Sequence, residues 1–259
     1  MNLLSRDEEL SKIFRYNVEI HKPMFYRPNL LIHTKRVKRI ALELANYLLK
    51  NSWKKIDIDL VWELAKFHDD TEIITWDYVS MTKISFSDEE QKKYENDCVN
   101  AIDILYGKYK NLSEKYDYKE LLLTIKNKNW IEFLIVDLAD KLDNHFEVTH
   151  ELFAWNIIFS VILYDWGLNV SNFDYTKNRL YERVEHLLEY FWKKLDLTNT
   201  FLDLSSTFTE KDCLNNSSKH NLSTIWKNSG YDLYDKWLNL HFKYWSEDDI
   251  NYLVNQLEF

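Results

Sequence analysis

Apolar residues recur at helical spacing through most of the first 195 residues of the chain. The clearest example lies within residues 34–50, where one helical face carries Val37, Ile40, Ala41, Leu44 and Leu48 and the outer face is basic. The same period predicts a second helix over residues 58–69. Ser87 and Glu90 have the spacing of a capping box, which predicts a third helix from there to about Gly107.

Similar patterns predict four further helices before residue 195, over residues 118–127, 129–145, 150–165 and 176–195. The composition then changes, because residues 197–224 are rich in Ser, Thr and Asn and are typical of irregular chain. Two short helical patterns follow at about 232–243 and 246–257. We therefore predict a main domain over residues 1–195 and a helical extension of unknown role over residues 196–259.

The composition strengthens the all-α prediction. The chain has 259 residues with only three glycines and two prolines, whereas tight hairpins need these residues. Aromatic residues make up 16% of the chain, which predicts a core packed with large rings.

Charge and cysteine content narrow the functional classes. The net charge of −9 argues against binding nucleic acid through a broad basic surface, although a small phosphorylated substrate needs only a few local cations. Two distant cysteines are typical of a reduced, cytoplasmic protein and are too few for a thiol-based zinc site. No apolar run is long enough for a membrane span, and the acidic N-terminal segment is unlike an export signal.

Four residues form a candidate metal centre: His33, His68, Asp69 and Asp140. Both histidines continue apolar helical stripes, and Asp140 interrupts a strongly apolar helix. A carboxylate at a helix C-terminus, as at Asp69 and Asp70, is unfavourable unless a positive group faces it, which favours a metal partner. Two imidazoles and two carboxylates suit one divalent transition ion, Mn, Co, Fe, Ni or Zn, rather than Ca²⁺.

The order of these residues resembles that of the HD-domain metal-dependent phosphohydrolases. The stretch HDDTEIITWD, residues 68–77, is most similar to a motif of the bacterial HD-domain 5'-deoxynucleotidases, with His68, Asp69, Glu72, Thr75 and Asp77 at its fixed positions. The pair Ala139-Asp140 is similar to the last motif of that family. The resemblance covers roughly residues 10–195 and implies an HD-domain helical bundle.

The resemblance also implies roles for individual residues. His33, His68, Asp69 and Asp140 would be the metal ligands. Glu72 would be the catalytic acid or base, and Asp77 would face the sugar. Arg15 and Arg27 are two candidates for the phosphate contact, and the motif does not choose between them. The extension has no counterpart in this family, and it is a candidate for a pocket cap, for an oligomer interface such as that of a homodimer, or for the mark of a divergent substrate.

The sequence thus predicts a metal-dependent phosphohydrolase, with hydrolysis of (deoxy)nucleoside 5'-monophosphates as the first reading. The alternative is a dNTP triphosphohydrolase or another nucleotide phosphohydrolase on the HD scaffold. A triphosphate substrate is less favoured because only four cations are found near the motifs, Lys35, Arg36, Lys66 and Lys141. A non-enzymatic alternative is a helical interaction module with a vestigial metal site.

Overall fold

The structure is a computed structural model that describes residues 5–16, 24, 28–77, 83, 86–127, 130–153, 156–160, 170–191 and 209–215. These residues form helices and no strand, and one antiparallel β-bridge joins Phe14 to Asn29. The predicted all-α class is therefore confirmed.

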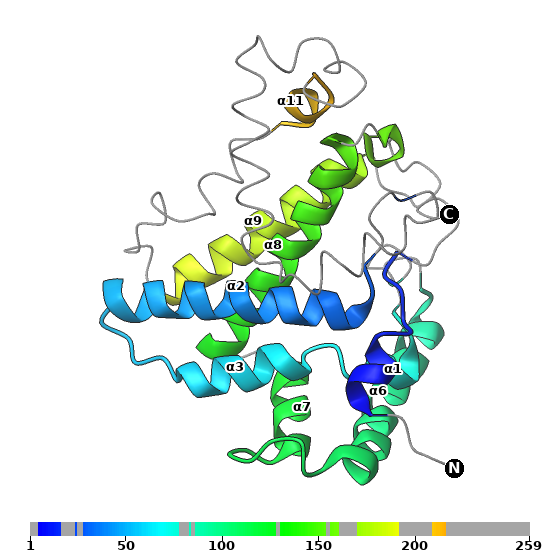
Figure 1. Ribbon diagram of the computed structural model, residues 1–259, viewed down its shortest axis with the longest axis vertical. Coiled ribbons are helices and arrows are strands. Elements are labelled where there is room, and N and C mark those ends of the chain that lie inside the picture. Colours follow the sequence, from blue (N-terminus) through cyan, green and yellow to red (C-terminus); the bar gives the residue numbers. More distant parts are fainter. Residues whose placement is uncertain are drawn as a thin grey trace. The chain divides into compact units, whose positions relative to one another are not determined.

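The chain divides into two compact units. Unit 1 contains Met1–Lys22 and Arg27–Ala139, and unit 2 contains Pro23–Tyr26 and Asp140–Phe259. Helix α8, Ile131–Phe153, is unbroken and runs from the first unit into the second (Figure 1). The sequence predicted a boundary near residue 195, between a main domain and an extension. The two compact units do not test that boundary, so it stays a prediction.

The described part of unit 1 contains these helices besides the first part of α8: α1 (Arg6–Leu10), α2 (Leu30–Asn51), α3 (Ile58–Phe67), α4 (Glu72–Thr75), α6 (Asp88–Tyr109) and α7 (Tyr118–Asn127). Helices α2 and α3 pack along each other, as the blue and cyan ribbons of Figure 1 show. Helix α7 packs on α3 and α6, while α4 contacts α6 and α1 contacts α2.

The helix predicted over residues 34–50 begins four residues earlier, at Leu30. Its N-cap is Asn29, whose side chain accepts a hydrogen bond from the backbone N–H of Ile32 at 3.0 Å. This cap places His33 inside the first turn of α2. The capping box predicted at Ser87 and Glu90 is present at the start of α6.

The aromatic core consists of Phe and Tyr among the described residues. Phe67 and Tyr118 are fully buried and meet edge to face with ring centroids 5.0 Å apart. In contrast, the four tryptophans within the described ranges are exposed: Trp53, Trp62, Trp76 and Trp130. The prediction of a ring-packed core therefore holds for Phe and Tyr, and these tryptophans lie at the surface.

Unit 2 contains the rest of α8, the short 3-10 helix η2 (Ile157–Ser160), α9 (Asn172–Tyr190) and α11 (Glu210–Asn215). Its core joins buried side chains of all four elements: Val148, Leu152, Phe153, Phe159, Phe173 and Cys213. Helix α9 begins at Asn172, after the N-cap Ser171 and four residues before the predicted start at residue 176.

The predicted break between helices 129–145 and 150–165 is wrong, because α8 continues to Phe153. His145, the last residue of the first predicted helix, is buried within α8 and contacts Thr176 Oγ1 of α9 at 3.1 Å. Tertiary partners of this kind let a helix continue through polar positions.

Within the segment predicted to be irregular, residues 197–224, the described part forms α11. The helices predicted over residues 232–243 and 246–257 lie outside the described residues. Across the ranges that the structure covers, no helix is both long and apolar enough to span a membrane.

Candidate metal centre and catalytic carboxylates

His33 is held in the core by the first turn of α2. Its side chain is fully buried, and its backbone N–H donates to the carbonyl of the N-cap Asn29 at 3.1 Å. The apolar residues one and two turns later, Val37 and Ile40, are fully buried as well. Because its helix face is packed, the His33 imidazole has a fixed direction.

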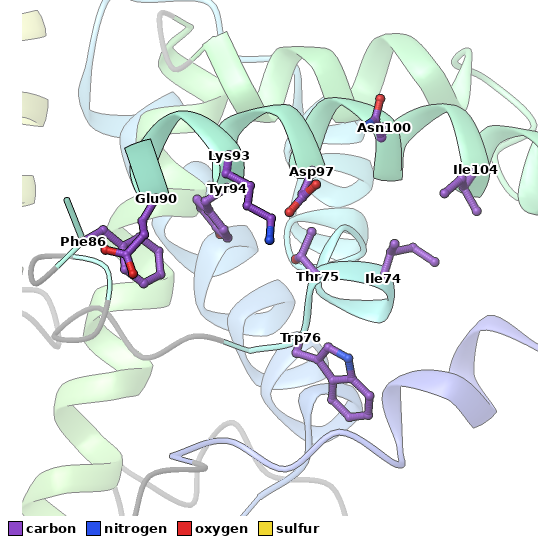
Figure 2. Close-up of a pocket in the computed structure, with 10 residues that line it drawn as sticks. All are labelled: Ile74, Thr75, Trp76, Phe86, Glu90, Lys93, Tyr94, Asp97, Asn100 and Ile104. Atoms are coloured by element: carbon purple, nitrogen blue, oxygen red, sulfur yellow. The ribbon is translucent and has the colours of Figure 1, made fainter. Parts of the chain in front are cut away.

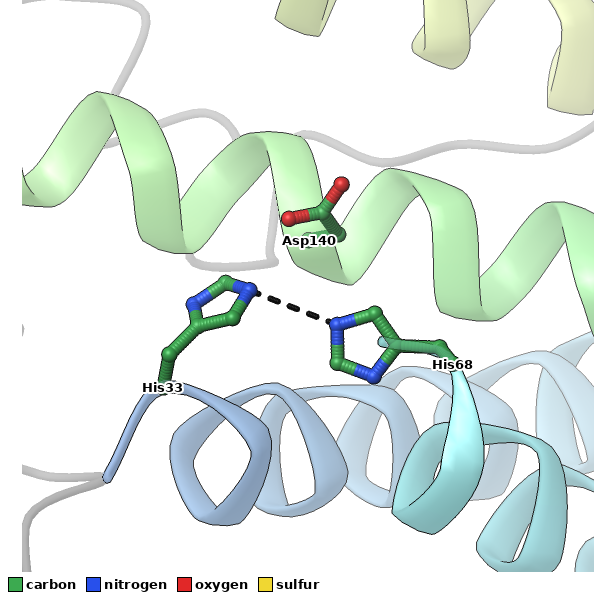
Figure 3. Close-up of side chains that lie close together, drawn as sticks. All are labelled: His33, His68 and Asp140. Carbon is green, nitrogen blue, oxygen red and sulfur yellow. Dashed lines mark hydrogen bonds between the residues drawn. The ribbon is translucent and has the colours of Figure 1, made fainter. Parts of the chain in front are cut away.

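His68 ends helix α3, directly after the buried Phe67. Its Nδ1 lies 2.9 Å from the carbonyl oxygen of Ala65. A carbonyl oxygen only accepts, so Nδ1 carries a hydrogen and Nε2 is the ring nitrogen left for another partner. That nitrogen faces Nε2 of His33 at 3.3 Å, as the dashed line in Figure 3 shows.

Asp69 completes a group of three converging atoms in unit 1 that can donate electron pairs to a metal. We call His33, His68 and Asp69 the donor group. Its Oδ2 lies 3.3 Å from Nε2 of His33 and 3.3 Å from Nε2 of His68. Burial alone would raise the pKa of Asp69, but the two imidazoles hold this pKa well below its usual range. Two nitrogens and one ionised oxygen aimed at one point have the composition and charge that a divalent cation requires.

Asp140 lies on α8 and is the first residue of unit 2, so a single peptide bond joins it to Ala139 at the end of unit 1. Its carboxylate pairs with Lys141. The neighbours Leu138, Ala139 and Leu142 are fully buried, which agrees with the apolar helix predicted around it. Figure 3 draws Asp140 together with the two histidines.

Asp70 has a different partner from its neighbour Asp69. Its buried carboxylate accepts hydrogen bonds from Nε of Arg6 at 2.9 Å and from the hydroxyl of Tyr118 at 2.6 Å. Arg6 also donates to the carbonyl of Lys66, in the last turn of α3. The positive group that faces Asp70 is therefore an arginine, and the general expectation of a metal partner for both aspartates is wrong for this one.

Glu72 opens α4, one turn after the donor group. Its backbone N–H donates to the carbonyl of Asp69 at 2.9 Å, which fixes the distance between the two residues. The side chain is 13% exposed, Oε1 lies 3.8 Å from Nζ of Lys83, and Oε2 is buried without a hydrogen-bond partner.

Burial, reinforced by the negative charges of Asp69 and Asp77, raises the pKa of Glu72 well above that of an ordinary glutamate. A carboxyl group whose pKa is shifted toward neutral pH is suited to general acid or base catalysis. This geometry agrees with the role that the motif predicts for Glu72, and the role itself stays a prediction.

Asp77 follows Trp76, which has an unusual backbone conformation. Trp76 has φ 66° and ψ 158°, a region that costs a residue with a side chain about 1–3 kcal/mol. Burial raises the pKa of Asp77, while the positive charge of Arg15 opposes that rise. Asp77 thus belongs to the same electrostatic group as Glu72 and Asp69.

Arg15 reaches the donor group from the N-terminal segment. Its Nη1 lies 3.9 Å from Oδ2 of Asp69, its side chain is 10% exposed, and its guanidinium lies over the ring of Tyr16. The backbone N–H of Arg15 donates to the carbonyl of Pro28 at 3.1 Å, next to the start of α2. The other candidate, Arg27, lies outside the described residues.

The structure adds residues that the sequence did not single out. Lys83 is the cation beside Glu72, although it falls in a stretch without a helical pattern. Arg6 and Tyr118 support the turn through Asp70, from opposite directions along the chain. The sequence hinted at these partners only through Asp69 and Asp70, because two neighbouring carboxylates at a helix end require positive groups nearby.

Residues 8–191 match the family described as 5'-deoxynucleotidase YfbR-like. An HD-domain phosphohydrolase from Listeria innocua has a similar solved structure, with a TM-score of 0.53 and 16% sequence identity over 81% of this chain and 93% of that one. At this identity the match shows the fold. No curated protein matches the chain. The chain therefore belongs to the YfbR-like 5'-deoxynucleotidase family and is a metal-dependent nucleotide phosphohydrolase with the HD-domain fold.

Proposed function

We propose that the enzyme hydrolyses deoxynucleoside 5'-monophosphates to the deoxynucleoside and inorganic phosphate. The observation that carries this proposal is the position of Glu72, one turn after the convergent donors His33, His68 and Asp69. An electropositive centre with an adjacent acid or base is the arrangement that phosphate ester hydrolysis requires. Family membership supports the nucleotide as the substrate.

The proposal includes one divalent transition ion, either Mn, Co, Fe, Ni or Zn, with His33, His68, Asp69 and Asp140 as its ligands. The donor set fits, since His33, His68 and Asp140 have the ligand types of a metal centre and Asp69 is ionised between the two imidazoles. When bound, such an ion polarises a phosphate oxygen and makes a water molecule more acidic.

The other residues act on the substrate itself. We assign to Glu72 the transfer of a proton between the attacking water or the leaving 5'-oxygen and its own carboxyl group. Arg15 is the phosphate contact, because its buried guanidinium offers a rigid pair of donors. Asp77 accepts a hydrogen bond from the sugar 3'-hydroxyl.

A monophosphate is favoured over a triphosphate by the number of cations. Within the described part of unit 1, Arg15 and Lys83 are the cations that contact Asp69 and Glu72 respectively. Two side-chain cations and one metal ion suit the charge of a single phosphate, whereas the three phosphates of a dNTP carry more negative charge.

Cys98 and Cys213 are both free thiols, which supports the cytoplasm as the compartment. We also propose a homodimer, with residues 196–259 as its interface.

The test is a substrate panel with metal content measured on the same sample. Purified enzyme is supplied with Mn²⁺ or Co²⁺ and incubated with dNMP, NMP, dNTP and a single-stranded oligonucleotide. We expect phosphate release from dNMP to have the highest kcat/KM and the oligonucleotide to be inert. Faster release of tripolyphosphate from dNTP would establish the triphosphohydrolase instead. Absence of both bound metal and turnover would favour the interaction module.

A further inference from the structure

A pocket of about 720 Å³ lies in unit 1 between the C-terminal end of α4 and helix α6 (Figure 2). Three aromatic residues line it, Trp76, Phe86 and Tyr94. The rings of Phe86 and Tyr94 lie 5.9 Å apart at 57°, so they form one continuous aromatic wall. No residue of the donor group or its acid lines this pocket, so it is a separate cavity.

Trp76 lines this pocket at the end of α4, and its exposed ring and strained backbone are both costly. The side chain is 63% exposed, which loses the usual gain from burying a large ring. Its positive φ is also a conformation that glycine adopts without strain. Neither cost benefits the fold, and backbone strain of this kind is concentrated at functional sites.

Helix α6, which carries Tyr94, also supplies polar groups at regular spacing. Lys93, Asp97 and Asn100 follow one another at intervals of four and three on α6, so they share one helical face along the pocket. An ammonium, a carboxylate and an amide together donate and accept hydrogen bonds. A nucleobase combines a planar face with an edge of donors and acceptors, so aromatic and polar walls of this kind are complementary to it.

Lys83 links this pocket to the catalytic carboxylates. Its Nζ lies 5.1 Å from the ring centroid of Tyr94 and 3.8 Å from Oε1 of Glu72. One side chain thus separates the aromatic wall from the proposed acid or base. Trp76 is also next to Asp77 in the chain, and its backbone N–H donates to the carbonyl of Glu72 at 2.9 Å.

We propose that the pocket between α4 and α6 binds the nucleobase of the substrate, with Trp76 stacking on the base and the face of Lys93, Asp97 and Asn100 contacting its polar edge. This inference rests on the proposed function, because it names the part of the same nucleotide that lies beyond the phosphate and the sugar. The 5'-phosphate then points past Lys83 toward Glu72.

The first test measures binding of deoxynucleosides without phosphate, thymidine and deoxyadenosine, by calorimetry on the full-length protein. Base–aromatic stacking predicts that Trp76→Gly lowers nucleoside affinity by about tenfold or more. Glycine relieves the positive φ, so the variant should keep or raise its Tm. The matched control is Trp53→Gly, since Trp53 is similarly exposed, at 59%, and lies away from the pocket.

A second pair of variants tests the polar face. Lys93→Ala should weaken nucleoside binding, whereas Lys92→Ala should not, because Lys92 is exposed and does not line the pocket. In turnover assays, Trp76→Gly should raise KM for dNMP and leave KM for the base-free 2-deoxyribose 5-phosphate unchanged.

The outcomes separate this inference from the proposed function. Nucleoside binding that depends on Trp76, in a protein that does not hydrolyse dNMP, would reject the proposed reaction and retain the pocket. Hydrolysis of dNMP with equal nucleoside affinity in Trp76→Gly and wild type would overturn the pocket assignment. A wild-type protein that binds no nucleoside at millimolar concentration would overturn it as well.

Discussion

Asp69 and Asp70 carry the same side chain on consecutive residues, yet their surroundings give them opposite tasks. Asp69 faces two imidazoles, which keep its carboxylate ionised and directed at the donor group. Asp70 points into the core and is neutralised by Arg6. Two consecutive residues therefore have two roles: Asp69 contributes to the candidate metal site, and Asp70 anchors the turn to Arg6 in the core.

At Glu72, we expect the variant Glu72→Gln to retain bound metal and lose activity by about 10²–10⁴-fold, because general acid or base catalysis contributes about that much. The loss should lie in kcat rather than in KM, since the proton moves only in the transition state. Measurement of kcat, KM and metal content on the same preparation tests this. Turnover close to that of wild type would remove Glu72 from the mechanism.

Lys83 provides a prediction about pH. Its positive charge lowers the pKa of Glu72, so the variant Lys83→Met should raise that pKa further. The limb of the kcat–pH profile that reports Glu72 should move to higher pH. Lys92→Met is the matched control, because Lys92 is exposed on α6. An unchanged limb in Lys83→Met would show that this limb belongs to another group.

At the residue scale, the metal-site candidates could be predicted because His33, His68-Asp69 and Ala139-Asp140 place ligand-type side chains on apolar helical stripes in the order of the HD motif. The structure brings His33, His68 and Asp69 together as expected. Lys83 could not be predicted, since its position beside Glu72 depends on how the chain returns to α4. The conformation of Trp76 gave no signal either, because a positive φ is expected of glycine and not of tryptophan.

At the scale of elements, the five-residue helix α1 is too short to be stable alone and depends on tertiary contacts. Arg6 pairs with Asp70, and Glu9 accepts from Lys108 and Tyr109 of α6. Its apolar residue Leu10 packs with Ile13 and Leu30. Polar contacts on both sides thus hold α1 in unit 1.

The variant Arg6→Met should destabilise the protein by about 3–5 kcal/mol, since it leaves the buried Asp70 without its positive partner. The free energy of unfolding in urea provides the measurement. For comparison, Lys115→Ala should change stability little, because its ion pair with Asp59 is exposed. Equal effects of the two variants would contradict the support assigned to Arg6.

His145 links α8 to α9 and should make unit 2 sensitive to acid. Burial, aided by the positive charge of Lys177, lowers the pKa of His145 to about 3 from 6.5. Its stabilising contribution is therefore complete above pH 6.5 and declines as the pH falls from 6.5 toward 3, because only the unfolded chain takes up the proton.

The loss from His145 approaches about 1.4 kcal/mol per pH unit within that window. His145→Gln should remove this part of the pH dependence while keeping a hydrogen-bonding group near Thr176. Thermal unfolding of both proteins between pH 7 and pH 4 tests the prediction. Parallel Tm–pH curves would assign the acid sensitivity to other residues.

Most elements could be predicted from apolar periodicity and caps, as at Ser87 for α6. Errors arose where tertiary contacts override local sequence. Asn29 starts α2 early because its side chain both caps the helix and donates to the carbonyl of Ser11. Helix α8 continues through His145 because Thr176 provides a partner that is 31 residues away.

At the scale of the whole molecule, metal removal should lower stability. An ion that binds only the folded chain adds about 2.7 kcal/mol at a concentration 100 times its Kd. We expect EDTA to lower the Tm of wild type and added Mn²⁺ or Co²⁺ to restore it. Asp69→Ala should bind no metal and show no EDTA-dependent shift. A shift equal to that of wild type would remove Asp69 from the ligand set.

The support of Asp70 also has a consequence for the order in which the molecule assembles. Arg6 and Tyr118 approach Asp70 from 64 and 48 positions away, so closing the turn requires two long loops to form first. Contacts of such sequence separation are slow to form. We therefore expect the segment with His68 and Asp69 to gain its final shape late in folding, after α2 and α3 have paired. During synthesis, this segment must wait until residue 118 has left the ribosome.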